Sequence, residues 1–292
     1  VRLWCLHLTT QKRTKVSDMA TTVKPAWLFV PGDRNDRYTK AAERSDVVIV
    51  DLEDAVSPAH KADARKAFLD FQNSDEALDP TKTVVRINPV GSEWFHSDLK
   101  LLSDLPGSGY SVMLPKVEDT EALEHIRGLK VYALIETVKG VVNVDTIAAH
   151  ESVTGLMWGA EDLFASLGGG HSRTAAGDYR APAVYTRARV LMAAKAHGKL
   201  AIDSVWTDID NLDDLGVEAD DAVNCGFDAK ALIHPKHVEV VRDAFRPSGE
   251  QLEWARGVIQ AASSADAGAW TYQGQMIDEP LLQQARNILT RA

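Results

Sequence analysis

Eight short apolar runs recur along the chain, and segments with helical periodicity separate them. Within each run the apolar residues are continuous instead of alternating with polar ones. This pattern is typical of strands that are buried on both faces of a parallel sheet. The pattern predicts strands at residues 27–30, 47–51, 83–87, 111–114, 131–135, 153–158, 199–203 and 230–233.

The segments between these runs carry apolar residues at helical spacing. They predict helices at residues 37–45, 61–71, 120–128 and 184–198, among others. Eight β/α alternations within about 220 residues favour a closed (β/α)8 barrel, the TIM barrel, over an open sheet. A doubly wound α/β fold is the alternative, but no GxGxxG motif follows the first predicted strand to support it.

A C-terminal extension follows the repeating pattern. We assign the barrel to residues 23–246 and the extension to residues 247–292. The extension begins as a helix that leads into a linker of small residues, and it continues as a short aromatic hairpin and a final helix. Asp278 is a good N-cap for that last helix, with Pro280 just inside it. The extension could cover the barrel mouth or reach a neighbouring subunit.

Residues 1–22 precede the barrel pattern. They are rich in basic residues, and a stretch that reads like a natural start begins at Met19. We expect residues 1–22 to be an N-terminal extension that is disordered or was added to the natural sequence, with a targeting peptide as the alternative.

The charge balance restricts the partners of this protein. Its 32 basic and 42 acidic residues give a formal net charge of −10. This balance argues against non-specific binding to nucleic acid or to an anionic membrane, and no apolar run is long enough to cross a membrane. Only two cysteines occur, Cys5 and Cys225, so the sequence predicts no disulfide framework and a reducing, cytoplasmic compartment.

In a TIM barrel, functional groups lie at the C-terminal ends of the strands. This sequence has charged or polar residues directly after every predicted strand, which places the candidate site at that end of the barrel. In chain order these residues are Asp33 and Arg34, Asp51, Glu53 and Asp54, Arg86 and Asn88, Lys116, Glu136, Glu161 and Asp162, Asp203, and His234.

Two of these carboxylates indicate a metal site. Glu136 and Asp162 end consecutive strands, so a barrel places them side by side. Two carboxylates with few other ligands suit Mg²⁺, which would be a Lewis acid for a substrate carboxylate and its adjacent oxygen. The alternative is that the acids at 161–162 only favour a helix N-terminus. The backbone at Gly159, Ala160 and Glu161 is also suited to receive a substrate carboxylate.

Four cations are candidates for binding anionic groups. Arg86 ends a buried strand and suits either a structural ion pair or the binding of a carboxylate or developing oxyanion. Arg34, and the pair Lys61 and Arg65 at i,i+4 on one helix face, suit a phosphorylated ligand such as a nucleotide. Solvated helix faces explain the same three residues.

Seven stretches of this chain together resemble the citrate lyase beta-subunit-like acyl-CoA lyases, a family within the Mg²⁺-dependent aldolases. The tail AWTYQGQMIDEPLLQQARNIL is similar to the C-terminal segment of malyl-CoA and citramalyl-CoA lyases. The resemblance spans about residues 25–290, in order. The seven stretches are LFVPGDRNDRYTKA, VIVDLEDAV, VVRIN, VMLPKVED, ALIETVKGV, WGAEDLFASLGG and ALIHPKHVEVV.

The resemblance implies a TIM barrel that cleaves a β-hydroxyacyl-CoA, citramalyl-CoA or malyl-CoA, to acetyl-CoA and a 2-oxo acid, pyruvate or glyoxylate. It implies that Glu136 and Asp162 are Mg²⁺ ligands. It also implies that Arg86 polarises the keto or alkoxide oxygen.

The resemblance further implies that Asp278 is an acid/base that a neighbouring subunit contributes, so the protein would be a homo-oligomer, a trimer or hexamer. Arg34, Lys61 and Arg65 would meet the phosphates of coenzyme A.

Other functions share the same residues. The chain could be a malyl-CoA thioesterase or a malate synthase-like enzyme, or the citryl-thioester lyase subunit of a citrate lyase complex. A non-catalytic coenzyme A-binding scaffold would not need the combination of Glu136, Asp162, Arg86 and Asp278. Related pyruvate-aldehyde aldolases carry a histidine after the second strand, where this chain reads DLED, so that activity is disfavoured.

Overall fold

The computed structural model describes residues 24–107, 109–263 and 269–292. The predicted extension at residues 1–22 and part of the predicted linker lie outside the described residues. The described chain divides into two compact units, Lys24–Ser248 and Gly249–Ala292. Among the described residues, no helix combines the length and the apolar character that crossing a membrane requires.

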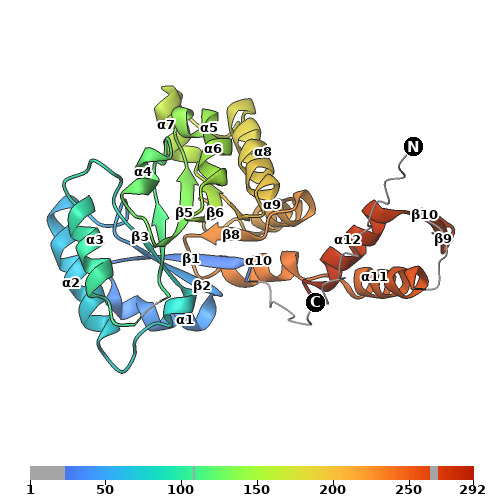
Figure 1. Ribbon diagram of the computed structural model, residues 1–292, viewed down its shortest axis with the longest axis horizontal. Coiled ribbons are helices and arrows are strands. Elements are labelled where there is room, and N and C mark those ends of the chain that lie inside the picture. Colours follow the sequence, from blue (N-terminus) through green and yellow to red (C-terminus); the bar gives the residue numbers. More distant parts are fainter. Residues whose placement is uncertain (1–23, 108, 264–268) are drawn as a thin grey trace, which may run out of the picture. The chain divides into compact units, whose positions relative to one another are not determined.

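Eight parallel strands close into a barrel in the first unit (Figure 1). β1 pairs with β2 on one side and with β8 on the other, which closes the sheet. The predicted TIM barrel is confirmed, and each strand begins and ends within one residue of its prediction. The strands are β1 (Ala26–Pro31), β2 (Val47–Asp51), β3 (Thr83–Arg86), β4 (Ser111–Leu114), β5 (Lys130–Ile135), β6 (Val153–Trp158), β7 (Leu200–Asp203) and β8 (Ala229–Leu232).

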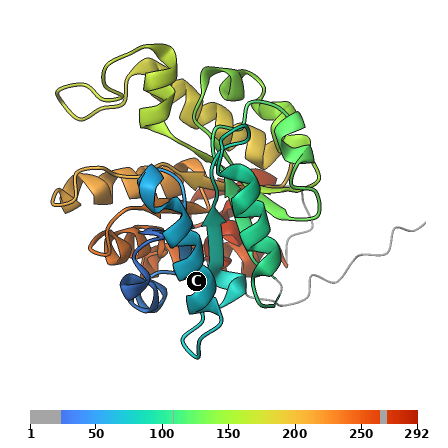
Figure 2. The ribbon, with the colours of Figure 1, turned by 90° about the vertical axis from the view of Figure 1, so that its left-hand side faces the viewer.

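Helices cover the outside of the strands (Figure 1 and Figure 2). The helix expected at residues 120–128 shortens to four residues, and turns ending at Gly128, with φ of 87°, lead from it into β5. The helices are α1 (Tyr38–Arg44), α2 (Lys61–Gln72), α3 (Phe95–Asp104), α4 (Glu121–Glu124), α5 (Val138–Val142), α6 (Val144–Ala149), α7 (Ala160–Leu167), α8 (Ala181–Ala196), α9 (Leu212–Cys225) and α10 (His237–Phe245).

Two separate apolar layers explain why the strand sequences are continuously apolar. In β2, Val47 and Ile49 belong to the cluster inside the barrel. Val48 and Val50 belong to the larger cluster between the strands and the helices. Because successive side chains point to opposite faces of a strand, both sets must be apolar.

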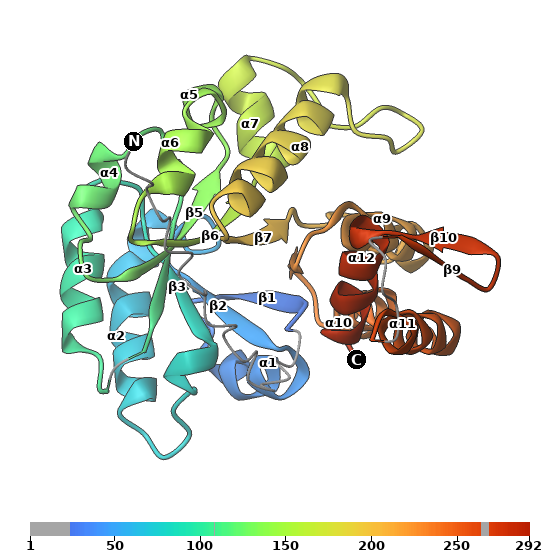
Figure 3. The same ribbon diagram turned by 45° about the vertical axis from the view of Figure 1, so that its right-hand side comes forward.

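The second unit has the elements that the tail sequence predicts. Helix α11 (Gly249–Ala262) is followed by the antiparallel strands β9 (Trp270–Tyr272) and β10 (Gln275–Ile277), and then by α12 (Glu279–Leu289), as Figure 3 shows. Gln273 and Gly274 both have positive φ, as a two-residue hairpin turn of type I′ requires.

Asp278 caps α12, as predicted, because its Oδ1 accepts a hydrogen bond of 3.3 Å from the Leu281 N–H. Pro280 lies in the first turn of the helix. This unit has an apolar core of its own, whose buried members are Ala255, Val258, Ile277, Leu282, Ala285 and Ile288.

Two helical glycines provide a matched stability test. A Cβ added to Gly140 in α5 would lie 2.4 Å from the carbonyl oxygen of Val117, whereas one added to Gly216 in α9 would meet only Val240 at 3.7 Å. We expect Gly140→Ala to lower the free energy of unfolding by about 1–3 kcal/mol, because backbone must move. We expect Gly216→Ala to raise it by about 0.4–1 kcal/mol through the unfolded chain. Urea unfolding measures both, and equal effects would contradict the packing argument.

Candidate functional site

A cavity of about 390 Å³ opens at the C-terminal ends of the barrel strands. Predicted polar residues from the ends of four strands, β2, β3, β5 and β6, line it, whereas those predicted after the other four strands do not: Asp33, Arg34, Lys116, Asp203 and His234. One part of its wall is apolar, and the rest carries acids and one arginine. The lining residues are Phe29, Pro31, Asp51, Asp54, Ala55, Arg86, Leu134, Glu136, Met157, Gly159, Ala160, Glu161, Asp162, Ser204, Val205 and Ile233.

Arg86 is held by acids on the neighbouring strand. Asp51 and Arg86 are register partners in β2 and β3. The Nε and Nη2 atoms of Arg86 donate to the two Asp51 oxygens at 2.8 and 2.6 Å, a bidentate pair. Its Nη1 lies 3.0 Å from Glu53 Oε2, and the guanidinium packs over the Phe29 ring. Burial alone would lower the pKa of Arg86, but Asp51 and Glu53 raise it, so the group remains a cation.

Asp51 also shapes the loop that follows β2. Its two carboxylate oxygens accept hydrogen bonds from the backbone N–H groups of Glu53, at 2.8 Å, and Ala55, at 3.1 Å. The Leu52 N–H donates to the carbonyl oxygen of Arg86. The DLED loop and Arg86 are therefore held together by one buried carboxylate.

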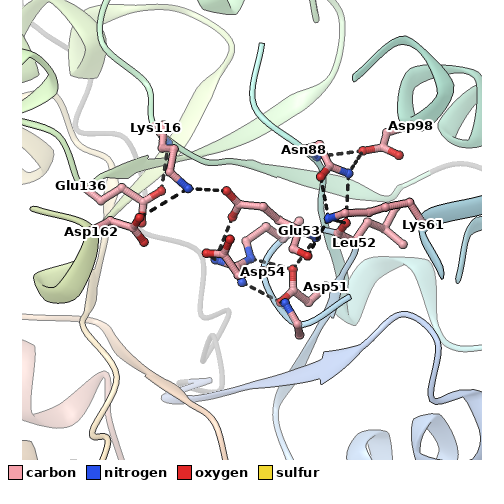
Figure 4. A network of polar contacts seen from close by, with 12 residues as sticks. Asp51, Leu52, Glu53, Asp54, Lys61, Asn88, Asp98, Lys116, Glu136 and Asp162 are labelled. Atoms are coloured by element: carbon pink, nitrogen blue, oxygen red, sulfur yellow. Dashed lines mark hydrogen bonds and ion pairs between the residues drawn. The ribbon is translucent and has the colours of Figure 1, made fainter. Parts of the chain in front are cut away.

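Lys116 links this loop to the predicted metal ligands (Figure 4). It adopts a left-handed backbone conformation, with φ of 52°. Its Nζ donates to Glu53 Oε1 at 2.6 Å and lies 3.5 Å from Asp162 Oδ1, while its N–H donates to Glu136 Oε1 at 3.0 Å. Burial alone would lower the pKa of Lys116, but Glu53 raises it, so this group is also a cation.

Glu136 is a buried acid surrounded by other acids. Its residue surface is 2% exposed. Burial, together with the nearby charges of Glu53 and Asp162, raises its pKa to about 8, against the opposing effect of Lys116 and Arg86. A Cβ on Gly159 would lie 2.7 Å from Glu136 Oε2, so only glycine leaves room for this carboxylate at the start of α7.

The donor set at Glu136 and Asp162 fits a divalent cation. Among the described residues, no group of three or more His, Cys, Asp or Glu side chains is arranged to hold a metal. Mg²⁺ does not need such a group, because it uses one or two carboxylates and completes its octahedral shell with water and substrate oxygens. Glu136 is buried near the acids Glu53 and Asp162, so a bound cation stabilises its ionised form. Glu136 and Asp162 therefore suit Mg²⁺ better than a metal that needs three or four protein ligands.

The N-terminus of α7 also faces the cavity. Gly159, Ala160 and Glu161 all line it, and no side chain caps this helix. Its first backbone N–H groups are therefore suited to an anionic ligand. The Glu161 carboxylate, in contrast, accepts a hydrogen bond from Ser172 Oγ at 2.7 Å.

The structure corrects the expectation for Lys61. This side chain does not point to solvent from a helix face, because the residue is 5% exposed. Its Nζ donates to the carbonyl oxygens of Leu52 and Glu53 and to Asn88 Oδ1. An ammonium has only three N–H groups, so none is left for a phosphate of coenzyme A.

The other two cations predicted to meet coenzyme A, Arg65 and Arg34, do not line the cavity. Arg65 donates to the buried carboxylate of Asp98 at 2.9 Å. Arg34 is partly exposed and pairs with Asp36 at 2.8 Å. Their contacts with coenzyme A remain predictions. Asp278 belongs to the second unit, and its acid/base role also remains a prediction.

Sequence reasoning assigned no role to Asp51, Glu53 or Lys116, although it noted all three at strand ends. The sequence signal for these residues was their position, because DLED (residues 51–54) and PK (residues 115–116) stand at the ends of buried strands. The left-handed backbone that turns Lys116 toward the other two strands was not visible in the sequence.

The fold and the site together define a TIM-barrel enzyme with its site at the C-terminal ends of the strands. Residues 26–235 match the model of the HpcH/HpaI aldolase/citrate lyase family, and the chain belongs to this family. The predicted family and the predicted enzyme class, a lyase, are thereby confirmed.

Relatives span nearly the whole chain. A citrate lyase subunit beta-like protein of Mycobacterium tuberculosis is 47% identical over 269 residues, which cover 92% of this chain and 95% of that protein. A mitochondrial citramalyl-CoA lyase of Mus musculus is 31% identical and covers 100% of this chain and 93% of its own length. The crystal structure of protein CitE from M. tuberculosis with magnesium, acetoacetate and coenzyme A matches with a TM-score of 0.86 and 45% identity, covering 94% of this chain and 99% of that one.

The raised pKa of Glu136 is testable in metal-free protein. We expect its carboxyl to titrate near pH 8, and Asp162→Asn to lower that pKa by removing one nearby negative charge. Because the folded state keeps this proton above the ordinary pKa of 4.5, the group's contribution to the free energy of unfolding falls as pH rises from about 4.5 to about 8. Carboxyl ¹³C NMR, assigned with Glu136→Gln, measures the pKa. Titration near pH 4.5 in both proteins would contradict the burial argument.

Proposed function

We propose that this protein is a Mg²⁺-dependent carbon–carbon lyase that cleaves a β-hydroxyacyl thioester of coenzyme A. The substrate is citramalyl-CoA or malyl-CoA, and the products are acetyl-CoA and pyruvate or glyoxylate. The observation that carries the proposal is the convergence of Glu136, Asp162 and Arg86 on one cavity. The citramalyl-CoA lyase relative and the related structure with magnesium and coenzyme A support it.

Two carboxylates would hold the cation. Glu136 and Asp162 supply oxygen ligands, and Gly159 keeps the space beside Glu136 open. Mg²⁺, when bound, supplies a Lewis acid for the substrate's carboxylate and neighbouring oxygen. The N–H groups at the start of α7 face the same cavity and bind a carboxylate of the substrate.

Arg86 stabilises negative charge as it moves onto the substrate oxygen. The ion pair with Asp51 fixes its guanidinium before the substrate binds, so little reorganisation accompanies the reaction. Lys116 contributes a second cation on the Asp162 side. Groups of this kind are worth about 3–4 kcal/mol of barrier each when they are removed.

Two protons must move. A base takes the hydroxyl proton of the substrate, the carbon–carbon bond breaks, and the enolate of acetyl-CoA then takes up a proton at carbon. We assign the acid/base role to Asp278 of a neighbouring subunit. The tail's similarity to the corresponding segment of malyl-CoA and citramalyl-CoA lyases supports this assignment. The protein is then a homo-oligomer, a trimer or hexamer. We place it in the cytoplasm.

Product analysis tests the reaction. Purified protein is incubated with citramalyl-CoA or malyl-CoA, with Mg²⁺ or with EDTA, and the products are identified by mass spectrometry. We expect acetyl-CoA and a 2-oxo acid, and we expect both to be lost in EDTA because the metal ligands then lack their cation. Free coenzyme A with malate or citramalate would instead indicate a thioesterase. No turnover of either compound would contradict the proposal.

Asp278→Asn separates catalysis from folding, because asparagine is as good an N-cap as aspartate. We expect it to keep substrate binding and to lower kcat by about 10²–10⁴-fold, the usual loss for an acid/base residue. The contrasting variant Glu136→Ala should abolish the response to Mg²⁺ altogether. Steady-state kinetics across a Mg²⁺ titration measures both. Full activity of Asp278→Asn would remove the tail from the mechanism.

A further inference from the structure

We propose that Lys61 is a positioning residue of the active site. Its buried ammonium holds the loop of residues 52–56 so that the Glu53 carboxylate stays between the two cations Arg86 and Lys116. This inference rests on the function proposed above. It assigns Lys61 no contact with the substrate.

The first step is the set of contacts at the ammonium (Figure 4). Lys61 Nζ donates to the carbonyl oxygens of Leu52 and Glu53, each at 2.7 Å, and to Asn88 Oδ1 at 2.8 Å. It also lies 5.0 Å from the centre of the Trp94 ring. All three acceptors are uncharged oxygens, and two of them are consecutive backbone carbonyls of one loop. The side chain thus fixes the path of the loop itself.

A second layer fixes Lys61 and the loop from behind. Asn88 Nδ2 donates to the Leu52 carbonyl oxygen at 3.0 Å and to Asp98 Oδ2 at 2.7 Å. Asp98 also accepts from the Asn88 N–H at 2.8 Å and from Arg65 Nη1 at 2.9 Å. Arg65 and Lys61 belong to the same face of α2. That face therefore acts on the loop directly through Lys61 and indirectly through Asp98 and Asn88.

The loop transmits this position to the cavity through Glu53. The backbone carbonyl oxygen of Glu53 accepts a hydrogen bond from Lys61 Nζ. The carboxylate oxygens of Glu53 lie 2.6 Å from Lys116 Nζ and 3.0 Å from Arg86 Nη1. Glu53 is itself buried, so its carboxylate has little room to compensate for a displaced backbone. A shift of the loop must therefore misplace Arg86, which lines the cavity, and Lys116, which lies beside Asp162.

An ammonium is specifically suited to this task. It directs three N–H groups from a single point to three converging acceptors, whereas the planar fork of arginine spreads its donors. Methionine has a similar length but no donor. Burial lowers the pKa of Lys61, so keeping a charge here is costly and needs the three acceptors to offset it.

A double-mutant cycle on turnover tests the proposal. We expect Lys61→Met to lower kcat by about 10–100-fold, as is usual for residues that orient site groups. We expect KM and the Mg²⁺ affinity to change by less than about threefold, because Lys61 contacts neither ligand. If Lys61 acts through Glu53, the double variant with Glu53→Gln should be no slower than Glu53→Gln alone.

The matched control is Lys66→Met on the same helix. Lys66 has a 74% exposed side chain, and its one ion pair within the described part of the chain is with Asp70. We therefore expect the kcat of Lys66→Met to stay at the wild-type value. Additive effects of Lys61→Met and Glu53→Gln, or full kcat in Lys61→Met, would overturn the proposal. If Lys61→Met does not fold, Lys61→Arg replaces it in the cycle, with the same expectations.

A readout without turnover distinguishes this inference from the proposed function. If wild-type protein cleaves neither thioester, the function is wrong, and hydrogen exchange of the Arg86 side-chain N–H then decides the inference. That signal is assigned by NMR with Arg86→Lys. We expect it to exchange at least about 10-fold faster in Lys61→Met, because the Asp51 and Glu53 contacts loosen. An unchanged exchange rate would overturn the positioning role.

Discussion

The ion pair of Arg86 with Asp51 and Glu53 is the interaction on which the rest of the site depends. It places a cation in a cavity wall whose other charged lining residues, Glu136 and Asp162 among them, are acids. Breaking a buried pair by removing one partner costs about 3–5 kcal/mol, because the other charge remains buried. The buried acids at the barrel mouth are therefore stable only together with the cations that pair with them. A divalent cation at Glu136 and Asp162 fits the same electrostatic requirement.

The parallel barrel makes that charge set possible. Each strand ends at the same rim, so residues far apart in the chain, such as Asp51 and Glu136, reach a common cavity without long loops. The strand interiors supply rigidity, since both of their faces pack against apolar clusters. The helices outside add a further function, because α2 fixes the DLED loop with a charged side chain instead of an apolar one.

Prediction succeeded where the signal is periodic and local. The strands, the barrel, the hairpin and the Asp278 cap follow from runs, turns and capping residues that lie within a few positions of each other. It failed at Lys61, where i,i+4 spacing indicated a cationic helix face, but the side chain turns inward to the loop carbonyls. The spacing of Lys61 and Arg65 does not reveal that the carbonyl oxygens of Leu52 and Glu53 lie opposite this face of α2. The roles of Glu53 and Lys116 were missed because each is defined by partners on other strands.

The fold and the polar rim of the barrel follow from the sequence, because alternation of buried strands with amphipathic helices admits few arrangements and parallel strands share one polar end. The family follows from seven stretches of residues. Which charges meet depends on the tertiary structure. These charge contacts depend on strand register, which pairs Asp51 with Arg86, and on the left-handed backbone at Lys116. They also depend on burial, which raises the pKa of Glu136 and removes Lys61 from solvent. Register, backbone conformation and burial arise from contacts between segments that are far apart in the chain, and a pattern along the sequence does not contain those contacts.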